Sequence, residues 1–114
     1  MKDGKYFKLQ EFSCKGSGLI AVKQELIEKL DKLREEFGSP IRVTSGYRSP
    51  DHNKKIGGHP NSTHTRGEAA DITASDLDRL YELCCKYFKS VGDGRKKGFI
   101  HVDLREDKIR RWDY

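Results

Sequence analysis

The sequence lacks any long hydrophobic run. Its longest uninterrupted apolar stretch is only a few residues, whereas a helix that crosses a bilayer needs about 20. No apolar segment follows residues 1–4, so we expect neither a membrane span nor a signal peptide in this chain. No internal repeat is visible either. At 114 residues, we expect a single domain over residues 1–114 with enough core to fold unaided, so that any metal site would be functional rather than structural.

Cysteine is scarce. The chain has three cysteines, an odd number, of which two are adjacent, and no C-x-x-C pair occurs. This is a poor disulfide framework, so we expect reduced thiols. Adjacent positions on a helix point about 100° apart, so at least one of Cys84 and Cys85 is expected to be a small buried hydrophobic residue.

Charge, by contrast, is abundant. Charged residues make up 36% of the chain against 34% hydrophobic, the net charge is +5, and basic residues cluster over 95–97 and 108–111. Such a balance suits a polyanion such as nucleic acid or a bacterial wall, although a solvated basic face is the simpler interpretation. Because no recognition-helix or aromatic RNA-binding pattern is present, we expect no nucleic-acid partner.

Hydrophobic spacing predicts helices that alternate with strands. The expected elements are a short segment over 9–14, a helix over 22–37, a strand over 41–44, a polar loop over 45–65, a strand over 69–73, a helix from 75 or 76 to 89, a turn over 92–94 and a strand over 99–104. We therefore predict an α+β fold in which helices pack on one side of a small antiparallel sheet. The aromatic tail over 112–114 is expected to dock on it.

The polar loop leads into the most informative part of the chain. A loop this long in a compact domain is usually functional or disordered, and we predict that it is functional. It contains His52 and His59, which either stay exposed or line a cleft. After it come the pattern S-x-H-x-x-G-x-A-x-D over residues 62–71 and, about thirty residues later, a second polar patch, H-V-D, over 101–103.

These two patches contain a possible metal-ligand set. His64, Asp71 and His101 offer two imidazoles and a carboxylate, and three such ligands suit a catalytic zinc ion that keeps one position for water. The odd separation of seven between His64 and Asp71 would place them on opposite faces of a continuous strand. The backbone must therefore bend between them, and Gly67 permits the bend. Isolated surface or core polar residues remain the alternative.

Three segments resemble one known family. Residues 62–71, STHTRGEAAD, closely resemble the signature of the zinc D-Ala-D-Ala carboxypeptidases, peptidase M15, whose fold is shared in outline with hedgehog-type proteins. Residues 43–50, with Asn53 and the glycine pair 57–58, look like the arginine-bearing loop of that family, and 99–105 look like its final strand. The resemblance runs in order over about residues 12–105.

The resemblance implies a role for each of these positions. It makes the histidines and aspartate above the ligands of one zinc ion, and Arg48 the cation that faces the substrate carbonyl or terminal carboxylate. Arginine suits this role because it offers a fixed fork of donors to a developing oxyanion. Ser62 is a candidate hydrogen-bond partner of the substrate, and Tyr47 either packs or contacts the substrate.

The chain departs from the family pattern at the general base. Many relatives carry a carboxylate three residues before the last histidine, or a second histidine two before it, but these positions hold Gly98 and Phe99. Asp103 lies two residues after His101 on the same strand face, and we predict that it is the base. Its alternative role is to orient a ligand histidine. Glu68 is a second candidate for the base.

Together these features predict a zinc metallopeptidase that hydrolyses an amide next to a D-amino acid in bacterial peptidoglycan, as a D,D-carboxypeptidase or an endopeptidase. Its partners would be peptidoglycan peptide stems, and we expect a monomer. The alternative is a zinc-containing, non-catalytic module that binds the wall or a partner. A phage lysis enzyme, made in the host cytoplasm, and a bacterial wall-remodelling module of the periplasm or exterior fit equally well.

Overall fold

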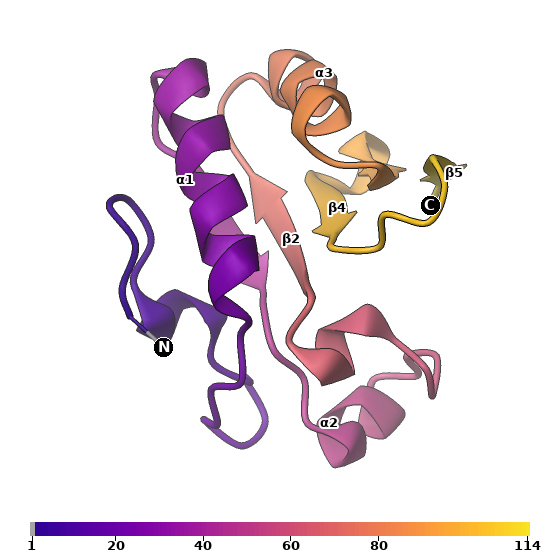
Figure 1. Ribbon diagram of the computed structural model, residues 1–114. Coiled ribbons are helices and arrows are strands. Elements are labelled where there is room, and N and C mark those ends of the chain that lie inside the picture. Colours follow the sequence, from indigo (N-terminus) through magenta and orange to yellow (C-terminus); the bar gives the residue numbers. More distant parts are fainter. Residues whose placement is uncertain (1) are drawn as a thin grey trace.

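A five-stranded sheet runs through the protein (Figure 1), in the strand order β1-β2-β4-β3-β5. The structure is a computed structural model that describes residues 2–114. The strands are β1 (Arg42–Ser45), β2 (Ala69–Thr73), β3 (Ser90–Gly94), β4 (Phe99–Asp103) and β5 (Arg110–Asp113). The helices are α1 (Gln24–Phe37), α2 (Pro50–Lys55) and α3 (Leu77–Tyr87), with 3-10 turns at Leu9–Phe12, Thr63–Arg66 and Arg95–Lys97.

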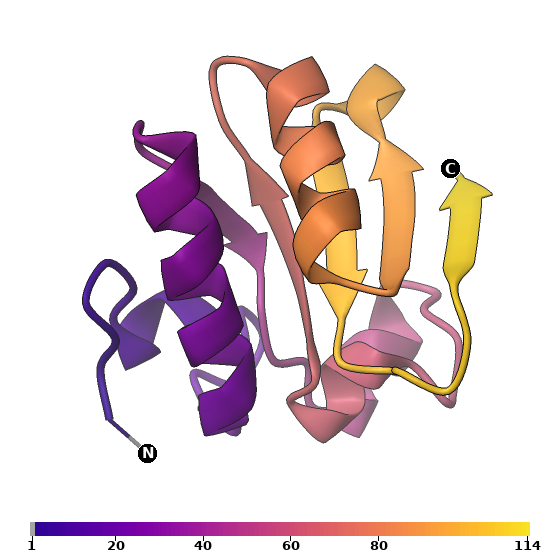
Figure 2. The ribbon, with the colours of Figure 1, turned by 45° about the horizontal axis from the view of Figure 1, so that its top comes forward.

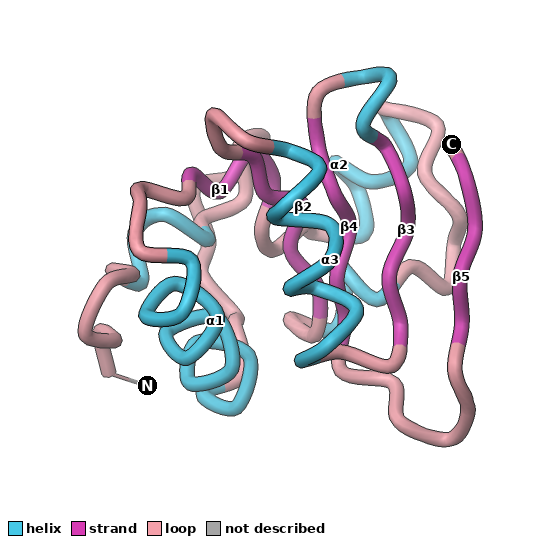
Figure 3. The backbone as a smooth tube through the Cα atoms, turned by 90° about the horizontal axis from the view of Figure 1, so that it is seen from above, coloured by secondary structure: helices cyan, strands magenta, loops and turns pink. Residues whose placement is uncertain are grey.

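Helices α1 and α3 lie side by side on one face of the sheet (Figure 2). The core lies between these helices and the sheet. It is formed by the hydrophobic stripe of α1 and by the side chains of β2 and β4 that face the helices. The core side chains of Leu30, Ile72, Ile100 and Val102 are completely buried. Helix α2 lies on the opposite side of the sheet (Figure 3). The structure confirms the predicted α+β class.

The opposite face of the sheet carries the polar residues. Side chains alternate along a strand, so the residues between the core positions point away from α1 and α3. Asp71 on β2 pairs in register with His101 on β4, His101 pairs with Gly92 on β3, and Gly92 pairs with Trp112 on β5. One cross-strand row therefore brings an acid, a histidine and an aromatic ring together.

The predicted turn over 92–94 is wrong, because these residues belong to β3. Glycine and aspartate are typical of turns, but here the glycines make room for rings from neighbouring strands. A Cβ on Gly92 would lie 2.6 Å from the Trp112 ring, and one on Gly94 would lie 2.7 Å from the Phe99 ring. Side-chain packing, rather than chain reversal, requires glycine at these positions.

The structure differs from the sequence-based prediction in two further ways, one in the loop over 45–65 and one in the direction of a strand. The expected loop over 45–65 contains α2, which Ser49 caps and Pro50 begins, and the first residues of a 3-10 turn. The sheet is antiparallel in four strands, but β5 pairs parallel with β3, so the sheet is mixed. The aromatic tail thus docks as an edge strand.

None of the helices within residues 2–114 has the length and hydropathy that a membrane span requires.

We predict that Gly67→Ala strongly destabilises the protein. Gly67 has φ +69°, and an added Cβ would lie 1.6 Å from the carbonyl oxygen of Ala21, so backbone must move. We expect a loss of about 3 kcal/mol or more in the free energy of unfolding, measured in urea without metal. Gly38→Ala is the control, since Gly38 has φ +75° but open space around it; it should lose about 1 kcal/mol. Equal losses would contradict the steric argument.

Candidate metal centre

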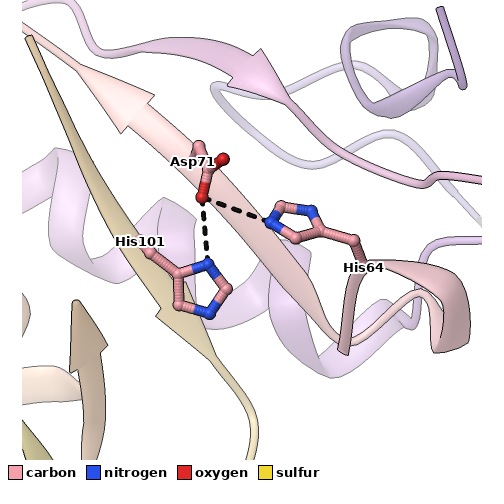
Figure 4. A group of neighbouring side chains, drawn as sticks. All are labelled: His64, Asp71 and His101. Carbon is pink, nitrogen blue, oxygen red and sulfur yellow. Dashed lines mark hydrogen bonds and ion pairs between the residues drawn. The ribbon is translucent and has the colours of Figure 1, made fainter. Parts of the chain in front are cut away.

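Three buried side chains converge from three separate elements (Figure 4). His64 lies in the 3-10 turn before β2, Asp71 on β2 and His101 on β4. Nε2 of His64 lies 3.2 Å from Oδ1 of Asp71, and Nδ1 of His101 lies 3.0 Å from the same oxygen. One ligand atom from each residue falls within 4.8 Å of the others. The structure thus brings the three expected ligands together.

The turn around His64 has local causes. Ser62 caps the turn, and its hydroxyl oxygen accepts a hydrogen bond from the His64 backbone N–H at 3.2 Å. Gly67 ends the turn in the left-handed conformation, which is the bend that the spacing of His64 and Asp71 requires. Nδ1 of the His64 ring donates to the carbonyl oxygen of Gly46 at 2.7 Å. The ring is therefore held with Nε2 towards Asp71.

The His101 ring is held in the same way from its other side. Its Nε2 lies 2.9 Å from Oδ2 of Asp103, a completely buried carboxylate. A carboxylate can only accept, so Nε2 carries the hydrogen, and Nδ1 is directed towards Asp71. Each histidine of the group thus has an acceptor outside the group that fixes its orientation.

This arrangement fits a cation. A carbonyl and a carboxylate hold one hydrogen on each neutral ring, so the two inward nitrogens present lone pairs to a carboxylate oxygen. Three lone-pair donors at such short range repel one another unless a cation or added protons lie between them. Two imidazoles and one carboxylate with outer hydrogen-bond partners are the donor chemistry of zinc sites.

Added protons, instead of a metal ion, could also relieve the repulsion between the inward lone pairs of His64, Asp71 and His101. Burial disfavours the charged form of His101, but the hydrogen bonds to Asp103 and Asp71 outweigh it and raise the pKa of His101. Burial would also raise the pKa of Asp71, but His101 and His64 hold it well below its usual range. A metal ion bound here would therefore compete with a proton on His101.

Arg48 contacts the second oxygen of Asp71. Its Nη2 lies 3.4 Å from Oδ2 of Asp71, while Nε and Nη1 donate to Ser45 and to the side-chain oxygen of Asn53. The side-chain amide of Asn53 is buried and in turn donates to the backbone of His59. The predicted arginine therefore lies beside the candidate metal ligands with its guanidinium plane fixed.

Asp103 is completely engaged by hydrogen bonds. Oδ1 accepts from the backbone N–H and Nε of Arg105, and Oδ2 accepts from His101, from Nη2 of Arg105 and from the buried hydroxyl of Ser90 at 2.8 Å. Burial alone would raise the pKa of Asp103, but His101 and Arg105 hold it well below its usual range. Ser90 was not predicted, because only the pairing of β3 with β4 places it opposite Asp103.

A pocket of about 460 Å³ opens beside His101. The 3-10 turn and the loop before it form one wall, and β5 with the end of β4 forms the other. Its lining residues are His59, Asn61, Ser62, Thr63, Arg66, His101, Arg105, Trp112 and Tyr114. The sequence indicated that the aromatic tail docks, but not that it would lie at this site.

Of the other residues that the sequence analysis singled out, some line the pocket and the rest lie outside it. Ser62 and His59 line the pocket. His52 lies against Gly16, and the half-buried Tyr47 has no side-chain hydrogen bond within residues 2–114. Glu68 is bound by Lys23 at 2.8 Å and by Arg66 at 3.0 Å. All three cysteines are free, and none belongs to the metal-ligand group found among the described residues.

Comparison with known proteins identifies the family. A family model described as Peptidase M15 matches residues 5–103, which is most of the chain. The chain belongs to the peptidase M15 family. Membership of this family and the buried His/Asp/His group support a metallopeptidase. A search of curated proteins finds no match.

We predict that Asp103→Asn destabilises the metal-free protein by about 2–4 kcal/mol, because it leaves Arg105 without its buried partner. The wild-type carboxylate, whose folded pKa is lowered, stabilises the protein fully above about pH 4, the pKa of an unfolded aspartate. This contribution is lost progressively as the pH falls below that value, so urea midpoints of variant and wild type should converge in acid. Asp107→Asn, at an exposed ion pair, should leave the midpoint unchanged. A pH-independent gap would contradict the assignment.

Proposed function

We propose that this M15 family member is a zinc metallopeptidase that hydrolyses an amide bond next to a D-amino acid in bacterial peptidoglycan, as a D,D-carboxypeptidase or an endopeptidase. The observation that carries the proposal is the buried group of His64, Asp71 and His101, whose inward donor atoms lie within 4.8 Å of one another. These three residues would hold one zinc ion. When bound, zinc polarises a carbonyl and lowers the pKa of water towards neutrality.

Arg48 is proposed to stabilise negative charge on the scissile carbonyl oxygen. Its guanidinium is already fixed by Ser45, Asn53 and Asp71, so little orientational freedom is lost when the substrate arrives. Hydrogen bonds from arginine strengthen as the carbonyl oxygen gains charge, which favours the transition state over the ground state. Ser62 lies at the edge of the same site, and its hydroxyl hydrogen is available to a substrate acceptor.

We propose the orienting role for Asp103. Oδ1 accepts hydrogen bonds from Arg105, and Oδ2 accepts from Ser90, His101 and Arg105. The lowered pKa of Asp103 makes it a weak proton acceptor near neutral pH. A carboxylate that accepts from the outer nitrogen of a histidine keeps the inner nitrogen free for a metal.

We expect the purified protein to contain one zinc ion per chain and to act on a muropeptide that ends in D-Ala-D-Ala. Product analysis by mass spectrometry should show release of D-alanine or cleavage of a crosslink, and a chelator should stop it, because the water and carbonyl would lose their activating ion. Zinc should restore the activity. The absence of any chelator-sensitive cleavage of monomeric or crosslinked muropeptides would refute the enzyme proposal.

His64→Ala tests the ligand set, since it removes one proposed ligand while leaving Asp71, His101 and Arg48 in place. It should lose both tight zinc binding and hydrolysis. His52→Ala removes a histidine that does not line the pocket and should retain both. If the His64 variant still bound one zinc ion tightly, the proposed ligand set would be wrong.

Asp103→Asn separates the two roles considered for this residue. An orienting carboxylate predicts a zinc affinity about 10–100-fold lower, measured by chelator competition, and substantial turnover once the site is saturated with zinc. A general base predicts the reverse, with zinc affinity retained and turnover lost in the zinc-saturated variant. The second result would contradict our assignment.

One observation favours a second candidate function. No aspartate or glutamate lines the pocket, and Asp103 and Glu68 are both held in ion pairs. A chain without an available base would bind zinc and wall peptides without cleaving them. Retention of zinc and of muropeptide binding, with no hydrolysis, would identify this binding module.

A further inference from the structure

The pocket beside His101 has an unusual charge distribution. Arg66 lies on one wall and Arg105 on the other, and none of the lining residues is an aspartate or a glutamate. His101 belongs both to this pocket and to the candidate metal ligands. A group that occupies the pocket would therefore lie directly beside an amide bound at His64, Asp71 and His101.

Both guanidinium groups are fixed from behind. Nε and Nη1 of Arg66 donate to the Glu68 carboxylate and to the carbonyl oxygen of Asn61, at 3.0 and 2.9 Å. Arg105 donates from Nε and Nη2 to Asp103, at 3.0 and 2.9 Å. Nη2 of Arg66 and Nη1 of Arg105 have no acceptor within residues 2–114. Because the side chains are already ordered, these two donors would bind an anion at a small cost in conformational entropy.

The ion pairs do not remove the positive character of the pocket. Glu68 is shared between Arg66 and Lys23, so two cations oppose one carboxylate there. Asp103 balances the charge of Arg105 and also accepts a hydrogen bond from the His101 ring, so the excess positive charge comes from Arg66 and Lys23. Both carboxylates lie behind the arginines and do not line the pocket.

The part of the second wall that β5 forms is aromatic. Trp112 packs across Gly92, which has no side chain to separate it from His101, and the two ring centroids lie 5.3 Å apart. The guanidinium carbon of Arg105 lies 5.8 Å from the Trp112 ring centroid. An apolar wall that excludes water strengthens hydrogen bonds between guanidinium groups and an anion. The volume of about 460 Å³ suits one amino-acid residue or a few.

We propose that this pocket is a carboxylate subsite, in which Arg66 and Arg105 bind a free carboxylate on the substrate residue next to the scissile amide. The inference rests on the proposed peptidase function for the position of the amide. Two sources of the carboxylate share the same chemistry: the terminal carboxylate of the peptide and a side-chain carboxylate. The residues are specificity-determining, and Arg105 also positions Asp103.

The chain supplies its own probe, because Trp112 is its single tryptophan. We would titrate the purified protein, as isolated and after chelator treatment, with three acetylated dipeptides and follow Trp112 fluorescence. The first is acetyl-D-Ala-D-Ala, the second is its C-terminal amide, and the third is acetyl-D-Ala-D-Glu amidated at its α-carboxyl, so that only the side chain carries charge. Measurement after chelation removes any binding of the carboxylate to a metal.

We expect one or both acids to bind about tenfold more tightly than the uncharged amide, and this preference to shrink at high ionic strength. Whichever acid binds more tightly identifies the source of the carboxylate. Arg66→Gln should reduce the preference to about twofold or less, whereas Arg66→Lys should retain part of it. Arg42→Gln removes the same charge from an exposed position outside the pocket and should change nothing.

Equal binding of acids and amide by the wild-type protein would overturn the subsite, and so would an unchanged preference in Arg66→Gln. The absence of a fluorescence response to all three dipeptides would overturn it as well. These outcomes are independent of hydrolysis. Carboxylate-selective binding without cleavage would leave the subsite standing while the enzyme proposal fails, and cleavage without selectivity would do the opposite.

Discussion

The outward hydrogen bonds of the two site histidines are the interactions on which the rest of the site depends. Gly46 accepts from His64, and Asp103 accepts from His101. These bonds decide which nitrogen of each ring faces Asp71, and so create a cluster of inward lone pairs that only a cation or extra protons can satisfy. Without them, either ring could turn its N–H inward and satisfy Asp71 with an ordinary hydrogen bond.

The sheet makes this arrangement possible by separating its two faces. Helices α1 and α3 cover the face that carries residues such as Ile100 and Val102, and the core between them supplies the hydrophobic stabilisation of the fold. The other face holds Asp71 and His101 in one cross-strand row, on rigid strands rather than on loops. The second His, His64, comes from a turn whose backbone is fixed by Ser62 and Gly67. The hydrophobic core and the candidate site therefore lie on opposite faces of the same strands.

The same row also positions the aromatic wall of the pocket. Gly92 continues the row from His101 to Trp112, and its missing side chain allows the two rings to approach. Ser90 and Asp103 occupy the neighbouring row and form the buried bond that supports His101. Strand β3 thus serves the site through a glycine and a serine, residue types that carry no metal-binding signal of their own.

The sequence by itself determined the α+β class, the helical face of α1, the strand over Ala69–Thr73 and the grouping of His64, Asp71 and His101 as candidate ligands. The helix and the strand follow from local hydrophobic periods, and the bend between His64 and Asp71 from their odd spacing. His101, thirty residues further on, was grouped with them because of its ligand chemistry and the family resemblance. Only the tertiary structure decided that residues 90–94 form a strand, that β5 runs parallel to β3 and that Asp103 is surrounded by donors. Each of these depends on which strands become neighbours, and register places side chains from distant segments opposite one another in a way that no local pattern encodes.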